Sequence, residues 1–237
     1  MDRAQSRSSA GRIAEPIAGA QVRIPAGPVL LEGDLDRPEG AVGIVLFAHG
    51  SGSSRKSPRN RAVANALVEG GLATLLFDLL TSEEEEIDSR TGALRFDIGL
   101  LAERLIEATD WVADQKLTSD LPIGYFGAST GAAAALVAAA ERPAAVRAVV
   151  SRGGRPDLAG PALPHVRAAT LLIVGGADYR VLALNREALA RLQTEKELVV
   201  VRGATHLFEE PGALSEVARL AGAWFLRYLR ADIARAG

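Results

Sequence analysis

Cysteine is absent from this sequence of 237 residues. A chain without cysteine has no disulfide framework, no thiolate nucleophile and no zinc site built from thiolates. Proteins of the reducing cytoplasm seldom contain disulfides, so the absence of cysteine favours a cytoplasmic location.

Long apolar segments and a strong net charge are also absent. The most apolar run, residues 132–140, is too short to cross a bilayer and stops at Glu141-Arg142-Pro143. The formal net charge of −2 gives no general electrostatic reason to expect nucleic acid or an anionic membrane as a partner. We therefore expect no nucleic-acid partner and no membrane partner. We expect the protein to be a monomer or a small homo-oligomer.

The N-terminal segment contains arginine and serine but no continuous apolar stretch, so it lacks the pattern of a signal peptide. We expect residues 1–16 to be a disordered leader and residues 17–237 to form a single domain. Hydrophobic residues make up 48% and charged residues 24% of the chain, which is typical of a globular protein long enough to bury a large core.

Short, almost wholly apolar segments alternate with helical patterns from residue 41 onward. Such segments predict strands that are covered on both faces, at residues 43–48, 72–77, 121–126, 146–151, 169–174 and 197–201. The intervening patterns predict helices at residues 58–70, 97–115 (with Asp97 as N-cap), 130–141, 184–193 and 213–230. An antiparallel hairpin is expected ahead of them, at residues 21–24 and 29–35. The predicted fold is α/β, with an eight-stranded, mostly parallel sheet and helices on both faces.

Residues 78–95 contain an acidic run, Glu83-Glu84-Glu85-Glu86, inside a stretch without a clear apolar period. We interpret this stretch as a long, solvated surface loop. The alternative is a role at the rim of a site.

The strongest functional motif is Gly127-Ala128-Ser129-Thr130-Gly131. It follows a predicted strand and precedes a predicted helix rich in small residues. A G-x-S-x-G sequence in this setting is typical of a nucleophile elbow, in which a strained turn exposes the serine hydroxyl at the sheet edge. Glycines flank the serine because a side chain there would collide with a neighbouring strand or helix. The alternative is a glycine-rich turn that only lets the helix pack closely.

A nucleophilic serine needs a base, and the chain has three histidines. His206 follows the last predicted strand, which places it at the same carboxyl edge of the sheet as Ser129. Asp178 follows the preceding strand and lies between the two in the expected order Ser, Asp, His. Asp178 could also cap the helix after it, and Asp157 is the competing candidate for the acid.

The turn after the first parallel strand, His49-Gly50-Ser51-Gly52-Ser53, is expected to contribute to an oxyanion hole. The candidate donors are the Thr130 and Ser51 backbone N–H groups, with His49 supporting the turn.

The same turn carries a competing motif. Residues 50–57 nearly match the P-loop pattern G-x-x-x-x-G-K-[ST], and Asp78 ends the next strand as a magnesium-binding acid would. However, Arg55 occupies the position of the second glycine, where a side chain obstructs the wrapping of a phosphate. Pro58 also interrupts the expected entry into the helix. A P-loop nucleotidase is therefore the weaker alternative.

Taken together, the HGSG turn (residues 49–52), GASTG (127–131), GGAD (175–178) and ATH (204–206) resemble the α/β-hydrolase superfamily and, within it, the dienelactone-hydrolase-like branch. The resemblance covers nearly the whole chain from about Val22. It implies a carboxylic-ester hydrolase that uses no cofactor and no metal, with Ser129 as nucleophile, His206 as base and Asp178 orienting the histidine.

The sequence departs from the branch at the nucleophile, since dienelactone hydrolases proper use cysteine and this chain has Ser129. A general carboxylesterase or arylesterase is therefore expected, acting on short-chain or aryl esters or lactones. Residues 152–167 are too few for a large cap domain. The alternatives are thioesters or activated phosphotriesters as substrates of the same triad, or a non-catalytic ligand-binding hydrolase fold.

Three further residues are candidates for substrate binding. Gly50 belongs to the oxyanion turn, and Arg152 and Arg155 lie beyond a strand end near the expected pocket. The arginines would pair with an acidic substrate or leaving group. The alternative for them is a salt bridge to Asp157 or to the acidic run.

Overall fold

The computed structural model describes residues 17–230, so the leader expected at residues 1–16 lies outside the described residues. Eight strands form one sheet in the order β1-β2-β4-β3-β5-β6-β7-β8. They are β1 (Ile17–Ala26), β2 (Val29–Arg37), β3 (Ile44–Ala48), β4 (Ala73–Phe77), β5 (Ile123–Ala128), β6 (Val146–Arg152), β7 (Ala169–Gly175) and β8 (Lys196–Val201). β2 pairs antiparallel with β1 and with β4, and every other pairing is parallel. The predicted fold class and edge hairpin are confirmed.

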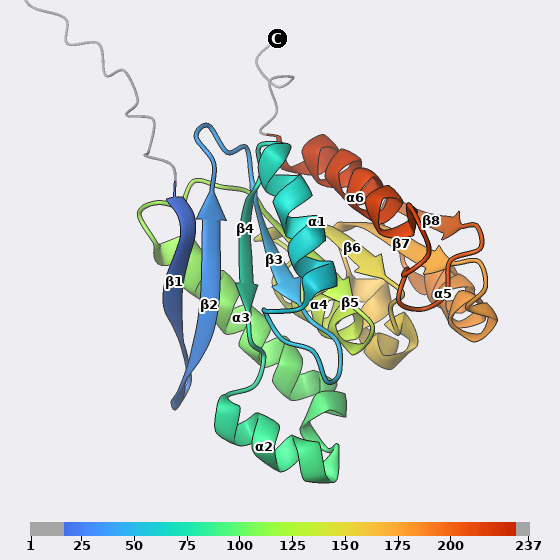
Figure 1. Cartoon of the computed structure of the whole chain (residues 1–237), viewed down its shortest axis with the longest axis horizontal. Helices are drawn as coiled ribbons and strands as arrows, with labels where there is room; N and C mark the ends of the chain where they lie inside the picture. Colours follow the sequence, from blue (N-terminus) through green and yellow to red (C-terminus); the bar gives the residue numbers. More distant parts are fainter. Residues whose placement is uncertain (1–16, 231–237) are drawn as a thin grey trace, which may run out of the picture.

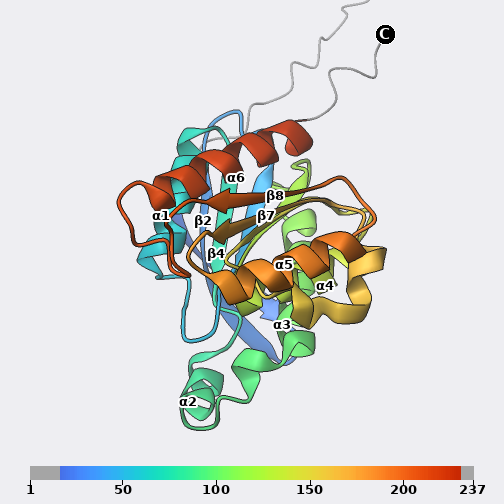
Figure 2. The same ribbon diagram turned by 90° about the vertical axis from the view of Figure 1, so that its right-hand side faces the viewer.

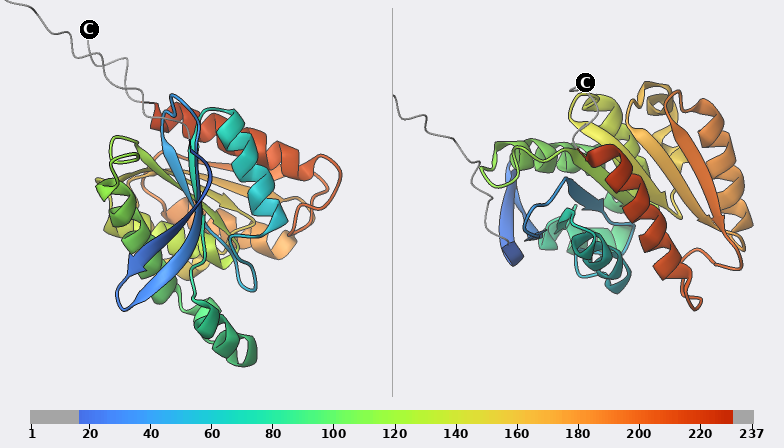
Figure 3. Two further views of the ribbon diagram at one scale, coloured as in Figure 1. Left: turned by 60° about the vertical axis from the view of Figure 1, so that its left-hand side comes forward. Right: turned by 90° about the horizontal axis from the view of Figure 1, so that it is seen from above.

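Helices cover both faces of the sheet (Figure 1). They are α1 (Pro58–Glu69), α2 (Ser82–Thr91), α3 (Ile98–Asp114), α4 (Thr130–Glu141), α5 (Tyr179–Arg191) and α6 (Ala213–Leu229), with short 3₁₀ helices η1 (Leu94–Phe96) and η2 (Pro156–His165). Figure 2 shows α6 and α5 on opposite sides of β7 and β8, and the views of Figure 3 show α1 beside α6. No helix among residues 17–230 is long and apolar enough to cross a membrane.

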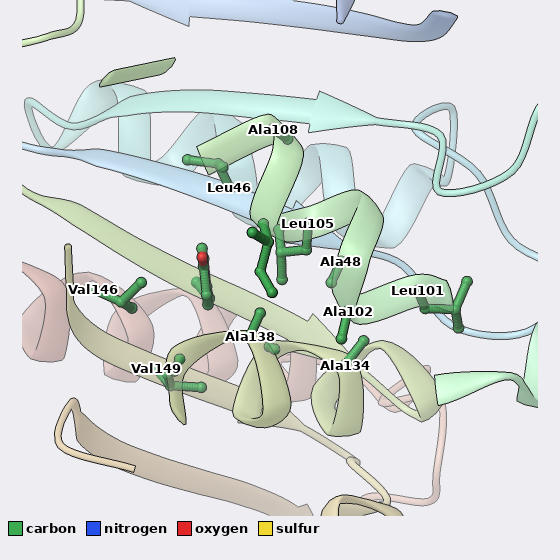
Figure 4. Close-up of a cluster of buried hydrophobic side chains, with 14 of the residues drawn as sticks. Leu46, Ala48, Leu101, Ala102, Leu105, Ala108, Ala134, Ala138, Val146 and Val149 are labelled. Carbon is green, nitrogen blue, oxygen red and sulfur yellow. The ribbon is translucent and has the colours of Figure 1, made fainter. Parts of the chain in front are cut away.

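The sheet separates the two larger hydrophobic cores. One lies under α3 and α4, where alanines let the two helices approach closely, and Ala134 and Ala138 face Ala102 and Leu105 (Figure 4). The other lies under α1 and α6. The central strands β3, β4 and β5 are buried along their whole length, which explains why their sequences are apolar without alternation.

The prediction of a loop over residues 78–95 is wrong, because this segment contains α2. A capping box begins the helix: Thr81 Oγ1 accepts from Glu84 N–H at 3.2 Å, and a Glu84 carboxylate oxygen accepts from Thr81 N–H at 2.8 Å. Glutamates in the first turn also suit the positive end of the helix dipole. Figure 1 shows α2 beyond the carboxyl ends of β3 and β4.

Other element boundaries differ by a few residues. α5 begins at Tyr179 and not at residue 184, because the Asp178 carboxylate accepts from Val181 N–H at 3.4 Å and caps the helix. The predicted cap of α3 is confirmed, since Asp97 Oδ1 accepts from Leu100 N–H at 3.0 Å. The connection between β6 and β7 holds only η2, so it carries no large cap domain, as predicted.

Candidate active site

Ser129 occupies the turn between β5 and α4. Its backbone angles are φ 51° and ψ −121°, and it is one of two non-glycine residues with positive φ among residues 17–230. A Cβ at Gly127 would collide with the Ala132 backbone, and one at Gly131 with the carbonyl of Ala48. The local geometry is therefore the strained strand-to-helix turn that the motif predicts.

His206 and Asp178 contact each other directly. Nδ1 of His206 lies 2.7 Å from Oδ2 of Asp178, which fits an N–H donated to the carboxylate. The Asp178 side chain is 15% exposed and that of His206 is 39% exposed, so the carboxylate is shielded while the imidazole is open to the surface. Asp178 also caps α5, so its carboxylate contacts both the histidine and the start of the helix.

The turn after β6 connects the serine to the histidine segment. The Ser129 N–H donates to the Arg152 carbonyl at 3.3 Å. At the next residue, a Cβ on Gly153 would lie 3.1 Å from the His206 carbonyl oxygen and 3.6 Å from its Cε1. Ser129 and His206 therefore lie against neighbouring residues of one turn, at the carboxyl edge of the sheet.

Asp157, the competing candidate for the acid, has a different partner. The guanidinium of Arg155 binds its two oxygens at 2.9 and 2.7 Å, and this hydrogen bonding raises the pKa of Arg155. Arg155 therefore forms the salt bridge that was the alternative to substrate binding.

Within residues 17–230, Arg152 does not form the salt bridge to Asp157 or to the acidic run that was considered for it. Its side chain is 7% exposed, Nη2 donates to Asn60 Oδ1 at 3.1 Å, and the guanidinium lies 6.0 Å from the centre of the Phe208 ring. Burial, with a contribution from nearby Arg59, lowers the pKa of Arg152 to about 10. Arg152 thus connects the first turn of α1 to the loop that follows His206. Nothing in the sequence pattern singles out Asn60 or Phe208 as its partners.

The two oxyanion candidates are in contact. Ser51 N–H donates to Thr130 Oγ1 at 3.1 Å, and the Ser51 and Thr130 hydroxyl oxygens are 3.0 Å apart. Gly50 lies against the elbow, since a Cβ there would be 3.0 Å from Ser129 Cβ. The turn after β3 is therefore next to the serine, as predicted, although its Ser51 N–H already has an acceptor.

His49 holds this turn through two hydrogen bonds of its imidazole ring. Its Nε2 accepts from Leu79 N–H at 3.0 Å, so Nδ1 carries the proton and donates to the Gly50 carbonyl at 3.1 Å. Burial lowers the pKa of His49 and favours the neutral ring. This arrangement agrees with the supporting role predicted for His49.

The residues of the P-loop-like motif are used in another way. Asp78 accepts from the Arg55 backbone N–H at 2.7 Å and also binds its guanidinium. Ser57 caps α1 by accepting from Asn60 N–H at 3.4 Å, and Pro58 begins the helix. The arginine and the strand-end acid therefore form an ion pair that closes the turn.

A cavity of about 500 Å³ opens beside the oxyanion turn. Its walls come from the turn after β3, the start of α1, the residues after β4, and α2 with η1. They include Gly50, Ser51, Lys56, Arg59, Leu80, Glu85, Asp88, Arg95 and Thr130. The wall from α2 was missed by the loop prediction, although the pattern Thr81-x-x-Glu84 could have revealed the helix. Within residues 17–230, no group of three or more His, Asp or Glu side chains could hold a metal ion.

An eight-stranded sheet with a serine on a strained elbow and a histidine–aspartate pair at the same edge defines the α/β-hydrolase fold of the serine hydrolases. The dienelactone hydrolase from Anabaena variabilis, known from a crystal structure, is 65% identical in sequence to this chain. The two structures match with a TM-score of 0.89 over 92% of this chain and all of that one. The chain therefore belongs to the dienelactone hydrolase family. No protein-family model matches it.

Two other comparisons add context. Proteins from two strains of Mycobacterium tuberculosis, provisionally named phosphoribosyl transferase, are 60% identical over 214 residues, which is 90% of this chain but 47% of each relative. The chain thus spans about half the length of these curated relatives. A dienelactone hydrolase-like promiscuous phosphotriesterase from metagenomic libraries shares the fold, with 16% identity, a TM-score of 0.72, and coverage of 89% of this chain and 98% of that one.

Proposed function

We propose that the protein hydrolyses carboxylic esters through an acyl-enzyme on Ser129. The observation that supports this best is the 2.7 Å contact between His206 and Asp178 at the sheet edge where the strained Ser129 turn also lies. A carboxylate that accepts from Nδ1 leaves Nε2 as the basic nitrogen, which is the tautomer that a serine nucleophile needs.

The reaction has two steps. Ser129 Oγ attacks the ester carbonyl while His206 Nε2 takes its proton, and the imidazolium is stabilised by Asp178. The Thr130 N–H stabilises the oxyanion, and the turn that contains Ser51 borders it. His206 then protonates the departing alcohol and later activates the water that releases the acid.

The cavity supports small or polar substrates. It measures about 500 Å³, and its walls carry serine hydroxyls and charged groups as well as Leu79 and Leu80. A long alkyl chain would leave the charged groups of such a wall without solvent. Short-chain and aryl esters or lactones therefore fit this cavity better than long-chain lipids. We place the protein in the cytoplasm.

The test is hydrolysis of a p-nitrophenyl ester chain-length series by the wild type and Ser129→Ala. We expect the substitution to lower kcat by about four to six orders of magnitude, and a fluorophosphonate to label the wild type alone. Ser215→Ala, an exposed serine on α6, is the matched control and should keep full activity. Near-parental turnover by Ser129→Ala would exclude this mechanism.

Other activities can be compared with ester hydrolysis. Activated phosphotriesters and thioesters would use the same triad, and the metagenomic phosphotriesterase shares the fold, so both belong in the substrate panel. The phosphoribosyl transferase name belongs to proteins of which this chain matches only 47%. This chain itself has the fold of a hydrolase, so the hydrolase function is the better supported one.

A further inference from the structure

The hydroxyl groups of Ser51 and Thr130 form a short chain of hydrogen bonds beside the elbow. Ser51 N–H donates to Thr130 Oγ1 at 3.1 Å, the two hydroxyl oxygens are 3.0 Å apart, and Ser51 Oγ donates to the Arg95 carbonyl at 3.4 Å. Thr130 is only 2% exposed, yet it lines the cavity. A backbone N–H has a single hydrogen, so Ser51 N–H is committed to Thr130 Oγ1 and not to a substrate oxygen.

The Arg95 carbonyl determines the direction of this chain. The carbonyl can only accept, so when Ser51 Oγ donates its hydrogen to it, Thr130 is the donor between the two hydroxyls. The Thr130 proton can rotate about the Cβ–Oγ1 bond of Thr130 toward the cavity. A hydroxyl that accepts an N–H hydrogen bond is also a stronger donor, because successive hydrogen bonds polarise one another.

We propose that the Thr130 hydroxyl is a further catalytic group of this site, and that it donates a hydrogen bond to the oxyanion of the tetrahedral intermediate. It acts beside the Thr130 backbone N–H, while Ser51 N–H polarises it from behind. The proton stays on Thr130 throughout: it turns from Ser51 Oγ to the oxyanion and returns when the carbonyl re-forms. This inference rests on the proposed acyl-enzyme function.

A role for the Thr130 hydroxyl as an acceptor alone makes a different prediction. If Thr130 Oγ1 only occupied the acceptor position on Ser51 N–H, removing the hydroxyl would free a backbone donor for the oxyanion. Turnover would then stay the same or rise. Thr130→Val replaces the hydroxyl by a methyl group at nearly constant volume. Thr130→Ala removes the hydroxyl and adds no methyl group, and Thr130→Ser retains the hydroxyl.

The experiment measures kcat and KM for p-nitrophenyl acetate and inhibition by an aryl trifluoromethyl ketone, which forms a tetrahedral adduct. We expect Thr130→Val and Thr130→Ala to lower kcat about 10²-fold, the cost typical of losing one oxyanion donor. KM should change little, the inhibitor should bind about 10²-fold more weakly, and Thr130→Ser should retain most of the activity. Hydroxyl-free variants that fold normally and turn over at the wild-type rate or faster would overturn the proposal.

Thr74→Val is the matched control, since Thr74 lies on β4 with a buried hydroxyl that has no partner within residues 17–230. It should leave kcat and inhibition unchanged. Fluorophosphonate labelling separates the two hypotheses. A wild type that does not label contradicts the ester-hydrolase function itself. A wild type and a Thr130→Val variant that label at equal rates contradict only the role of the Thr130 hydroxyl.

Discussion

At the residue scale, one carboxylate serves both the fold and the site. Asp178 Oδ2 contacts His206, and Asp178 Oδ1 caps α5. These two uses can be separated, because asparagine is as good an N-cap as aspartate but carries no charge to stabilise an imidazolium.

Asp178→Asn should therefore lower kcat by about 10³–10⁴ with little change in the free energy of unfolding. Asp178→Ala should show the same loss of kcat and also cost about 1 kcal/mol of stability through the missing cap. Urea denaturation and ester hydrolysis measure the two effects. Asp157→Asn is the control, and if it impaired turnover as strongly as Asp178→Asn, the assignment of the acid would have to change.

The sequence predicts which residues come together at the candidate site where each lies within five residues of the end of an apolar strand. Ser129, Asp178 and His206 all have this position, and parallel strands bring such residues to one edge. Arg152 ends a strand too, but its contact with Asn60 joins two elements that are 92 residues apart along the chain. No local pattern encodes such a contact, so the role of Arg152 could not be predicted.

At the element scale, the turn after β3 has no regular structure and depends on its anchors. His49 and Arg55 tie it to residues 78–79. The anchor at His49 requires a neutral ring, since Nε2 has to accept from Leu79 N–H.

Stability should consequently depend on pH through His49. Burial places the pKa of folded His49 below the unfolded value of 6.5. Below about pH 6.5 the unfolded chain binds a proton that the folded chain does not, so the stability supplied by the neutral ring is present at higher pH and is lost as pH falls. The loss amounts to at most about 1.4 kcal/mol per pH unit.

Urea denaturation of the wild type and His49→Asn between pH 8 and 5 tests this. The variant should be less stable at pH 8, because the Leu79 N–H and the Gly50 carbonyl lose a well-placed partner. The difference between the two proteins should shrink as the pH falls. A difference in stability that stays constant or widens over this range would contradict a lowered pKa of His49 in the folded protein.

α2 shows where sequence patterns fail for a whole element. Its only buried residue is Asp88, so it has no apolar stripe from which a helix could be predicted. Its capping box and its first-turn acids stabilise it locally, and the partly buried Asp88–Arg95 ion pair, at 2.5 Å, fixes the segment after it. Arg95 in turn supplies the carbonyl that binds Ser51.

At the scale of the whole molecule, the two cores share one sheet. Strands β3 to β6 contribute residues to both cores, for example Leu46 to one and Phe47 to the other. Each core also contacts one of the two tryptophans of the chain. Trp111 on α3 packs against the first core and Trp224 on α6 belongs to the second. Unfolding of either core would expose one face of the sheet on which both cores depend.

We therefore expect the two cores to unfold together. Trp111→Phe leaves a fluorophore that reports on the α6 face, and Trp224→Phe leaves one that reports on the α3 face. Leu105 is fully buried in the first core alone, so Leu105→Ala should cost about 2–5 kcal/mol there. Added to each single-tryptophan protein, it should lower both fluorescence midpoints in urea by the same amount, because a cooperative transition has one free energy. If only the Trp111 signal shifted, the two sides of the sheet would be separate folding units, and a damaged α3 core could coexist with an intact α6 face.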